Sequence, residues 1–402
     1  MNLSTTSQAG PAVLVYRDDL LGYSETFIAD QALALRRFHP ILVGIRSVRG
    51  LAVAHDAQLL AHSGRLERCR RIWTKLVGPA RSRLRELAAF NATLIHAHFL
   101  IDAATAGQIA EALQIPMIVS VHGYDATVSD GGLLSMGCAE RAYLLRRNSV
   151  LRRASQFLCV SHYLRGKLLA KGFPQEKLSV HYTGIDTEFF SPTQGSERLP
   201  RILFVGRLVE KKGCEYLIRA MEIVQARVPS AELTIIGDGP LRPQLEELAR
   251  TKLRSFQFLG SQPREFVKAH MNLSTVFCVP SVIASSGDAE GFGMVFAEAQ
   301  AMGLPVVSFA TGGIPEAVEH GNTGFLAHER DYGQLAEFIA VLLTNPSLWR
   351  HMSETGQARV RRMFDIRRQT SKLEQIYTDF SSLLARKAVN AFDLREAFEH
   401  RP

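Results

Sequence analysis

The sequence has few cysteines and no long apolar segment, and each absence excludes a class of protein. Among its 402 residues the five cysteines are Cys69, Cys138, Cys159, Cys214 and Cys278. They are widely spaced and form no CxxC pair, so neither a zinc site nor a disulfide framework is expected. No stretch approaches the roughly 18 apolar residues of a membrane span, and the segment MNLSTTSQAG lacks the order of a signal peptide. We therefore expect a cytoplasmic protein, neither exported nor integral.

Acidic residues are too few to balance the basic ones. The net charge is +8 at pH 7, and most of the excess lies in residues 1–190. A basic half of a chain favours anionic partners such as phosphates, lipid headgroups or nucleic acid, and charge alone does not choose among them.

Short apolar, β-branched runs recur along the chain and predict buried parallel strands. In the first half they cover residues 11–17, 40–46, 92–98, 116–123, 156–161 and 178–186. The pattern begins again after the Ser/Pro/Gly-containing stretch 191–200, at residues 201–207, 231–239, 255–260, 275–281 and 304–310. The chain length fits two domains, and this stretch is the expected linker.

Helical patterns lie between these strands. They cover residues 25–37, 102–113, 162–171, 213–227, 241–251, 292–302, 332–344 and 347–363, and residues 366–385 form a further periodic segment. Alternation of strands and helices is typical of βαβ units. We therefore predict an α/β fold with two doubly wound sheets, whose ligands bind where the C-terminal ends of the strands meet.

Residues 65–88 combine basic and apolar side chains. The basic ones are Arg65, Arg68, Arg70, Arg71, Lys75, Arg81, Arg83 and Arg85. They alternate with apolar residues that include Trp73, a pattern that resembles a membrane-surface helix pair broken near Pro79. The alternative is a solvated helix whose Trp73 packs inward.

The most informative stretch is SSGDAEGFGMVFAEAQAMGLPVV, in which seven residues separate Glu290 from Glu298. Glu290 precedes a predicted helix, and Glu298 lies about two turns inside it. The first turn would consist of Phe292, Gly293, Met294 and Val295, whose unpaired N–H groups suit a diphosphate. The two carboxylates would then bind neutral hydroxyls, those of a ribose at Glu298 and of a sugar at Glu290. Two unrelated surface glutamates are the alternative.

The segment VGRLVEKKG, residues 205–213, carries Arg207 at a strand end and Lys212 before a helix. Two cations in one loop could clamp a pyrophosphate and stabilise the charge that develops on a departing nucleotide diphosphate. A metal ion would otherwise supply that charge, but no DxD motif follows a strand. The alternative is a solvated basic turn.

Polar residues also follow strands of the first half. His122 and Asp125 lie in VHGYD, His96 and His98 in HAHF, and Ser24 and Glu25 in YSETF. His122 could bond a donor sugar, and Ser24, Glu25, His98 and Asp125 are candidates for acceptor contacts. Structural histidines and helix caps are the alternative.

Together these segments resemble glycosyltransferase family 4 with the GT-B fold. The resemblance rests on VGRLVEKKG, IIGDGP at 235–240, the glutamate pair, VHGYD, and AMGLPVVSFATGGIPEAVEHGNTGFL at 301–326. SETFI at 24–28 and SSGDAEG at 285–291 are similar to the branch that builds exopolysaccharides such as colanic acid and amylovoran. One departure is the first strand–helix loop, LLGYSETF, which has only Gly22 where many members have two glycines, so acceptor contacts carried over from the family are in doubt there.

The resemblance implies two Rossmann-like domains facing a central cleft. The first, acceptor-binding domain would cover residues 1–192, joined by the C-terminal helix at about 380–402, and the donor-binding domain residues 193–379. The catalytic residues would be His122, Arg207, Lys212 and Glu290. The donor-binding residues would be Gly206, Gly237, Gly239, Pro240, Phe292, Gly293, Met294, Val295 and Glu298, with backbone at Gly312–Gly313 shaping the pocket.

The resemblance further implies a retaining transfer that needs no metal and no cofactor. The donor would be a UDP- or GDP-hexose, and the acceptor a glycan or a lipid-pyrophosphate-linked sugar. We expect contact with the inner face of the membrane through residues 65–88, and no nucleic-acid partner. The alternatives are a nucleotide-sugar epimerase, a sugar phosphorylase, or a non-enzymatic module that binds anionic ligands or membranes.

Overall fold

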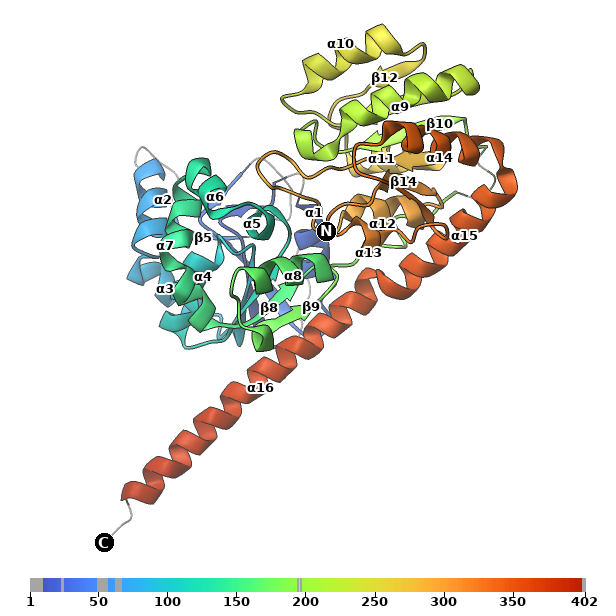
Figure 1. Ribbon diagram of the computed structural model, residues 1–402. Coiled ribbons are helices and arrows are strands. Elements are labelled where there is room, and N and C mark those ends of the chain that lie inside the picture. Colours follow the sequence, from blue (N-terminus) through green and yellow to red (C-terminus); the bar gives the residue numbers. More distant parts are fainter. Residues whose placement is uncertain are drawn as a thin grey trace. The chain divides into compact units, whose positions relative to one another are not determined.

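The chain forms two compact units (Figure 1). We describe the computed structural model for residues 10–22, 25–48, 57–61, 67–193, 195 and 197–399, including their side chains except those of residues 67–68 and 383–399. Ser24, Arg65 and the Arg68 side chain, singled out in the sequence, lie outside the described residues. The first unit consists of Met1–Val160, Arg165–Thr183 and Ile366–Pro402, and the second of Ser161–Leu164 and Gly184–Asp365.

The first unit is built on a parallel sheet. Within the described residues its strands lie in the order β5 (Gln58–Leu59), β3 (His39–Gly44), β1 (Ala12–Tyr16), β6 (Leu94–His98), β7 (Met117–Val121), β8 (Ala154–Cys159) and β9 (Leu178–Val180). The short strands β2 (Asp19–Leu20) and β4 (Arg46–Ser47) pair separately. β6 and β7 are buried along their whole length, as expected of central strands whose two faces are covered.

Helices cover both faces of this sheet. They are α1 (Thr26–Leu33), α2 (Glu67–Leu76), α3 (Arg81–Ala88), α4 (Ala103–Leu113), α5 (Tyr124–Thr127), α6 (Asp130–Met136), α7 (Cys138–Arg153), α8 (His162–Ala170), the 3₁₀ turn η3 (Gln175–Lys177) and α16 (Ile366–Glu399). α4 packs on α7 and carries α2 and α3 on its outer side, whereas α1 and α16 pack together (Figure 1). Sequence analysis predicted α1, α4, α8, α16 and a helix pair that corresponds to α2 and α3, and it missed α5, α6 and α7.

The second unit repeats the architecture. Its parallel strands, among the described residues, lie in the order β12 (Phe256–Phe258), β11 (Glu232–Ile236), β10 (Arg201–Val205), β13 (Val276–Cys278), β14 (Val306–Phe309) and β15 (Gly324–Ala327). Its helices are η4 (Glu210–Lys212), α9 (Cys214–Arg227), α10 (Arg242–Lys252), α11 (Arg264–Leu273), α12 (Met294–Ala301), α13 (Ile314–Ala317), α14 (Tyr332–Thr344) and α15 (Pro346–Met363). The predicted α/β class with two doubly wound sheets is confirmed; β15 and α11 were missed.

The boundaries between the units differ from the sequence-based ones at residues 192/193 and about 380. The predicted strand at 178–186 ends at Val180, and from Gly184 the chain belongs to the second unit. There the Ile185 N–H donates to the Phe364 carbonyl at 2.8 Å, and Thr187 Oγ1 donates to Asp365 Oδ2 at 2.5 Å. These bonds place the change of unit at residues 183/184 and 365/366.

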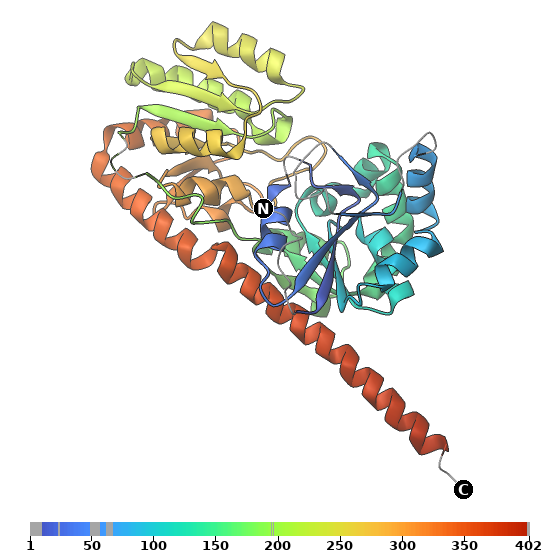
Figure 2. The same cartoon turned by 180° about the vertical axis from the view of Figure 1, so that it is seen from behind.

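The C-terminal helix α16 is part of the first unit from its beginning. It runs without a break in both views (Figures 1 and 2). Leu373 and Tyr377 are buried in the core with residues of β1, α1 and β6. The Glu374 carboxylate accepts hydrogen bonds from the backbone N–H groups of Arg36 and Arg37, at 2.7 and 2.5 Å. The periodic segment predicted at 366–385 therefore anchors the end of α1.

Among the described residues, no helix combines the length and the apolar character that crossing a membrane requires.

Candidate functional site

β10 and β13 are neighbours in the second sheet. The strands that follow β10 in sequence lie on one side of this pair, and those that follow β13 lie on the other, so the loops after β10 and β13 lead in opposite directions. Such a switch point opens a crevice at the C-terminal ends of parallel strands. The loop after β10 carries Arg207 and Lys212, and the loop after β13 carries Glu290. The topology therefore brings three of the predicted catalytic residues to one end of one sheet.

Lys212 and Glu290 form an ion pair across these loops. The distance from Lys212 Nζ to Glu290 Oε2 is 2.6 Å, and the two side chains are 16% and 12% exposed. Burial alone would raise the pKa of Glu290, but Lys212 and Lys211 lower it below its ordinary value. Glu290 is therefore ionised at neutral pH, with Lys212 as its counterion. The sequence predicted both residues but not this pairing.

The residues beside this pair tie the same loops together. Lys211 Nζ lies 3.0 Å from Asp288 Oδ2, and the Glu210 carboxylate accepts hydrogen bonds from the Ser285 N–H and hydroxyl, at 2.9 and 2.8 Å. Arg207 differs, since its side chain is exposed and its guanidinium has no hydrogen bond or ion pair to the described part of the chain. It is the cation of this loop that can turn to an added anion without breaking a contact.

Two glycines after β14 hold the backbone of Glu290. The Gly313 N–H donates to the Glu290 carbonyl at 2.9 Å. Gly312 has a φ of +57°, and a Cβ there would lie 2.4 Å from that same carbonyl oxygen; a Cβ at Gly313 would lie 1.9 Å from the Gly291 oxygen. No larger residue fits without moving the Glu290 loop.

The helix α12 begins directly after this loop. Gly293 precedes it with a φ of +82°, and within the described part of the chain no side-chain hydrogen bond caps its first N–H groups. Phe292 is buried, Met294 and Val295 are half-buried, and Glu298 lies in the second turn and is half-buried. Uncapped N–H groups and the positive end of the helix dipole favour an anion at this position.

The loop after β11 packs on the loop that carries Arg207 and Lys212. A Cβ at Gly237 would lie 1.9 Å from the Gly206 oxygen, and one at Gly239 would lie 2.5 Å from the Leu208 oxygen. Pro240 follows, exposed at the edge. The glycines predicted as donor-binding residues thus allow two backbones to approach closely.

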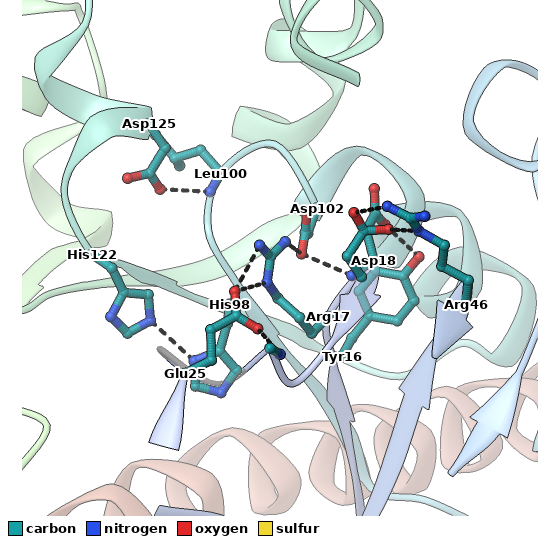
Figure 3. Close-up of polar contacts among 12 residues, drawn as sticks. Tyr16, Arg17, Asp18, Glu25, Arg46, His98, Leu100, Asp102, His122 and Asp125 are labelled. Carbon is teal, nitrogen blue, oxygen red and sulfur yellow. Dashed lines mark hydrogen bonds and ion pairs between the residues drawn. The ribbon is translucent and has the colours of Figure 1, made fainter. Parts of the chain in front are cut away.

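The first unit has its own switch point, between β1 and β6. Arg17, directly after β1, donates from Nη1 to Asp102 at 2.6 Å and from Nε to Glu25 at 2.9 Å (Figure 3). Its guanidinium lies 4.5 Å from the centre of the Phe99 ring. Burial raises the pKa of Asp102 and the charge of Arg17 opposes this rise. Sequence analysis missed Arg17 and Asp102, although Arg17 ends a predicted strand and Asp102 begins a predicted helix.

Two predicted acceptor residues are bonded to backbone. Glu25 Oε2 accepts from the Gly22 N–H at 3.2 Å, and its other oxygen faces Arg17. Asp125, 1% exposed, accepts from the Gly123 and Leu100 N–H groups at 3.0 and 2.9 Å (Figure 3). These carboxylates fix loops after β1, β6 and β7, and an acceptor contact from either remains a prediction.

His122 and His98, the remaining candidates, are bonded to each other. His122 Nε2 lies 3.0 Å from His98 Nδ1 (Figure 3). Burial, followed by the nearby His96 and Arg17, lowers the pKa of His122 to about 3. His122 is therefore a neutral imidazole at pH 7.

Two parallel doubly wound units, each with charged loops at its switch point, define the GT-B class of glycosyltransferase folds. The family model described as Glycosyl transferases group 1 matches residues 186–359, and that of Glycosyltransferase Family 4 matches residues 24–189. The chain therefore belongs to glycosyltransferase family 4, and the predicted family is confirmed.

The amylovoran biosynthesis glycosyltransferase AmsK of Erwinia amylovora is 35% identical over 62% of this chain and 61% of its own. The GDP-mannose-dependent alpha-(1-6)-phosphatidylinositol monomannoside mannosyltransferase of Mycobacterium tuberculosis (strain CDC 1551 / Oshkosh) is 34% identical over 48% of this chain and 55% of its own. The chain thus matches less than two thirds of the length of these relatives.

The crystal structure of Anabaena Alr3699/HepE in complex with UDP-glucose has the same fold. It is 18% identical, with a TM-score of 0.74 over 92% of this chain and 99% of that one. At this identity the likeness concerns the fold alone.

The contact between Gly312 and Glu290 gives a first prediction. Gly312→Ala should destabilise the second unit more than Gly321→Ala does, by about 1–3 kcal/mol, the typical penalty of forcing extra atoms into a packed site. Gly321 is the matched control, because its φ is +81° but no atom lies within 4 Å of its Cβ position. Urea unfolding of both variants measures the difference, and equal losses would contradict the assigned contact.

Proposed function

We propose that the protein is a retaining, metal-independent glycosyltransferase that transfers a hexose from a UDP- or GDP-sugar. The acceptor would be a glycan or lipid-linked sugar in bacterial exopolysaccharide or cell-surface polysaccharide biosynthesis. The observation that carries the proposal is the Lys212–Glu290 pair at the switch point of the second sheet, beside the uncapped start of α12. Family membership and the named activity of AmsK support it.

In this proposal the donor diphosphate binds Arg207, Lys212 and the first N–H groups of α12. An ammonium group has three donors, so Lys212 can keep its bond to Glu290 and add one to a phosphate oxygen. Glu298 binds the ribose hydroxyls, and Glu290 binds a hydroxyl of the hexose. His122 supplies a polar ring for a sugar hydroxyl. Each carboxylate thus meets neutral hydroxyls rather than phosphate.

The transfer itself exchanges one bond to the anomeric carbon for another on the same face. The bond from that carbon to the diphosphate oxygen breaks, the bond to the acceptor oxygen forms, and the acceptor's hydroxyl proton moves to the departing diphosphate. Lys212 and Arg207 stabilise the charge that develops on that leaving group. Because these cations supply the charge, no metal ion and no cofactor is needed in the proposal.

We also propose peripheral attachment to the inner face of the cytoplasmic membrane through α2. Ile72, Trp73, Leu76 and Val77 form one stripe and are 41%, 64%, 48% and 56% exposed. Trp73 therefore does not pack inward, so that part of the alternative is wrong. The neighbouring Arg70 is exposed. An apolar stripe beside basic residues is typical of helices that lie on anionic membranes.

Not all the basic residues of this segment are available to lipid. Lys75 Nζ lies 3.0 Å from the buried Asp18 carboxylate, and Arg83 pairs with Glu86. Among the described side chains of this segment, the exposed arginines are Arg70, Arg81 and Arg85. The proposed membrane contact therefore depends on the apolar stripe and on a few arginines.

Donor binding is tested by thermal unfolding with UDP, GDP, ADP, UDP-glucose and GDP-mannose. We expect the nucleotides of one base to raise the free energy of unfolding by about 2.7 kcal/mol when the ligand concentration is 100 times its dissociation constant. Lys212→Ala and Glu298→Gln should weaken that effect. If none of these ligands shifts the melting temperature, the proposed donor site is wrong.

Catalysis is tested with Lys212→Ala. If Lys212 stabilises the leaving group, turnover should fall by roughly 10²–10³-fold, as for loss of an oxyanion donor. The measurement is acceptor-dependent release of nucleotide diphosphate in the presence of EDTA. Lys252→Ala is the control, since its ammonium pairs with Glu222 at 2.7 Å on the surface of the same unit. A near-normal rate for Lys212→Ala would remove its catalytic role.

Membrane attachment is tested by sedimentation with vesicles that contain anionic phosphatidylglycerol. Trp73→Ser combined with Arg70→Gln should lower the bound fraction several-fold, because it removes apolar area and one charge from the stripe. Leu199→Ser is the control, an exposed apolar residue of the second unit. Unchanged partitioning of the double variant would count against attachment through α2.

A further inference from the structure

Three histidines lie together in the first unit, and the proposed transfer uses only one of them. His96 and His98 are in β6, and His122 directly follows the neighbouring strand β7. The His96 and His98 rings are 4.5 Å apart between centres, and His98 and His122 lie edge to edge, with centres 5.2 Å apart and an angle of 17° between the planes. The three rings form a short column.

His96, at one end of this column, is hydrogen-bonded to the C-terminal helix. His96 Nδ1 lies 2.6 Å from the Tyr377 hydroxyl of α16, and His96 Nε2 lies 2.8 Å from the Ser120 hydroxyl. At the other end, the ring centres of Phe27 and Phe99 each lie 4.8 Å from the centre of the His122 ring. The orientation of every ring is therefore fixed by packing and hydrogen bonds.

Burial keeps the column uncharged. It is the largest cause that lowers the pKa of His96, His98 and His122, and neighbouring histidines lower each value further. Arg17 adds to the effect at His98 and His122. A neutral imidazole has one N–H donor and one acceptor nitrogen. The bond between His98 Nδ1 and His122 Nε2 must therefore contain a single proton, which fixes one tautomer relative to the other.

The surroundings of His98 decide which residue donates. Its Nε2 has no hydrogen-bond partner among the described residues. Either tautomer leaves one N–H without a partner among the described residues, His98 Nε2–H or His122 Nδ1–H. His98 is 1% exposed whereas His122 is half-buried, so the unpaired N–H is less unfavourable on His122. His98 therefore carries its proton on Nδ1 and donates to His122 Nε2. His122 in turn carries its own proton on Nδ1.

We propose that His98 is a positioning residue that fixes His122 as a hydrogen-bond donor through Nδ1–H. His122 then binds an oxygen of a hydroxyl group and does not act as a base, since its Nε2 already accepts from His98. The identity of that hydroxyl group as a sugar hydroxyl rests on the proposed function. The tautomers do not, because they follow from contacts within the first unit.

The tautomers can be read by nitrogen-15 NMR of the full chain labelled at histidine, at pH 7.5. Single variants of His96, His98 and His122 to Asn assign the signals. We expect a protonated Nδ1 and an unprotonated Nε2 for both His98 and His122. A protonated Nε2 on His122 would overturn the proposal, whether or not any transferase activity is found.

A second test separates donation from ring packing. His98→Asn places an amide N–H near the former Nδ1 and keeps the donor, whereas His98→Phe keeps an aromatic ring at this position and loses the donor. For a site that transfers sugars, His98→Phe should lower kcat about five- to tenfold, the usual effect of one lost hydrogen bond, with His98→Asn closer to the parent. In His98→Phe, NMR should show both tautomers of His122.

The controls address folding and donor binding. Thermal unfolding of each variant shows whether it is folded, and the nucleotide-induced shift should be unchanged because the nucleotide site lies in the second unit. His351→Gln, an exposed histidine of α15, should behave as the parent. Equal kcat and equal tautomer ratios in His98→Asn and His98→Phe would refute a positioning role.

Discussion

A charged side chain that is buried at the end of a strand must be paired, and this constraint organises both units. At the two switch points the chain places a cation after the first strand of the unit and a carboxylate on the neighbouring loop. Arg17 meets Asp102 in the first unit, and Lys212 meets Glu290 in the second. An unpaired charge at that depth would be strongly unfavourable. Each pair thereby joins two loops that the sheet topology separates.

Such pairs contribute more to geometry than to stability. The cost of removing two charges from water offsets most of their attraction, so a buried ion pair is weak evidence for a stable fold. The ion pair has a stronger effect on where the two side chains lie, because moving one of them away leaves the other as a buried charge without a counterion. In the second unit Gly312 and Gly313 also help to fix Glu290, because they let its backbone pack closely against the loop after β14. Glu290 is held by its side chain and by its carbonyl group, which suits a residue proposed to contact a substrate.

Much of this could be predicted from the sequence, because strands and helices follow from local patterns. The strands at β1, β6, β7 and β10 are apolar runs, and the helix α14 has the bounds that its periodicity indicates. α7 was missed because its arginines obscure the apolar face. β15 was missed because its residues, GFLA, begin with glycine and include no β-branched side chain. Lys212 and Glu290 were found from motifs. Their mutual contact was not, since it depends on how two loops 78 residues apart approach each other.

In the loop after β1, too, the contacts could not be predicted from the sequence. They account for the single glycine of this loop, where many family members have two. Where many members have two glycines, this chain has Gly22 and the carboxylate of Glu25. That carboxylate accepts from the Gly22 N–H and from Arg17, so the backbone donor that two glycines would expose is already satisfied. An acceptor phosphate could use this N–H only by displacing Glu25, which would leave Arg17 with Asp102 as its remaining carboxylate partner. Under the proposed function, the first unit therefore binds its acceptor through groups other than this amide.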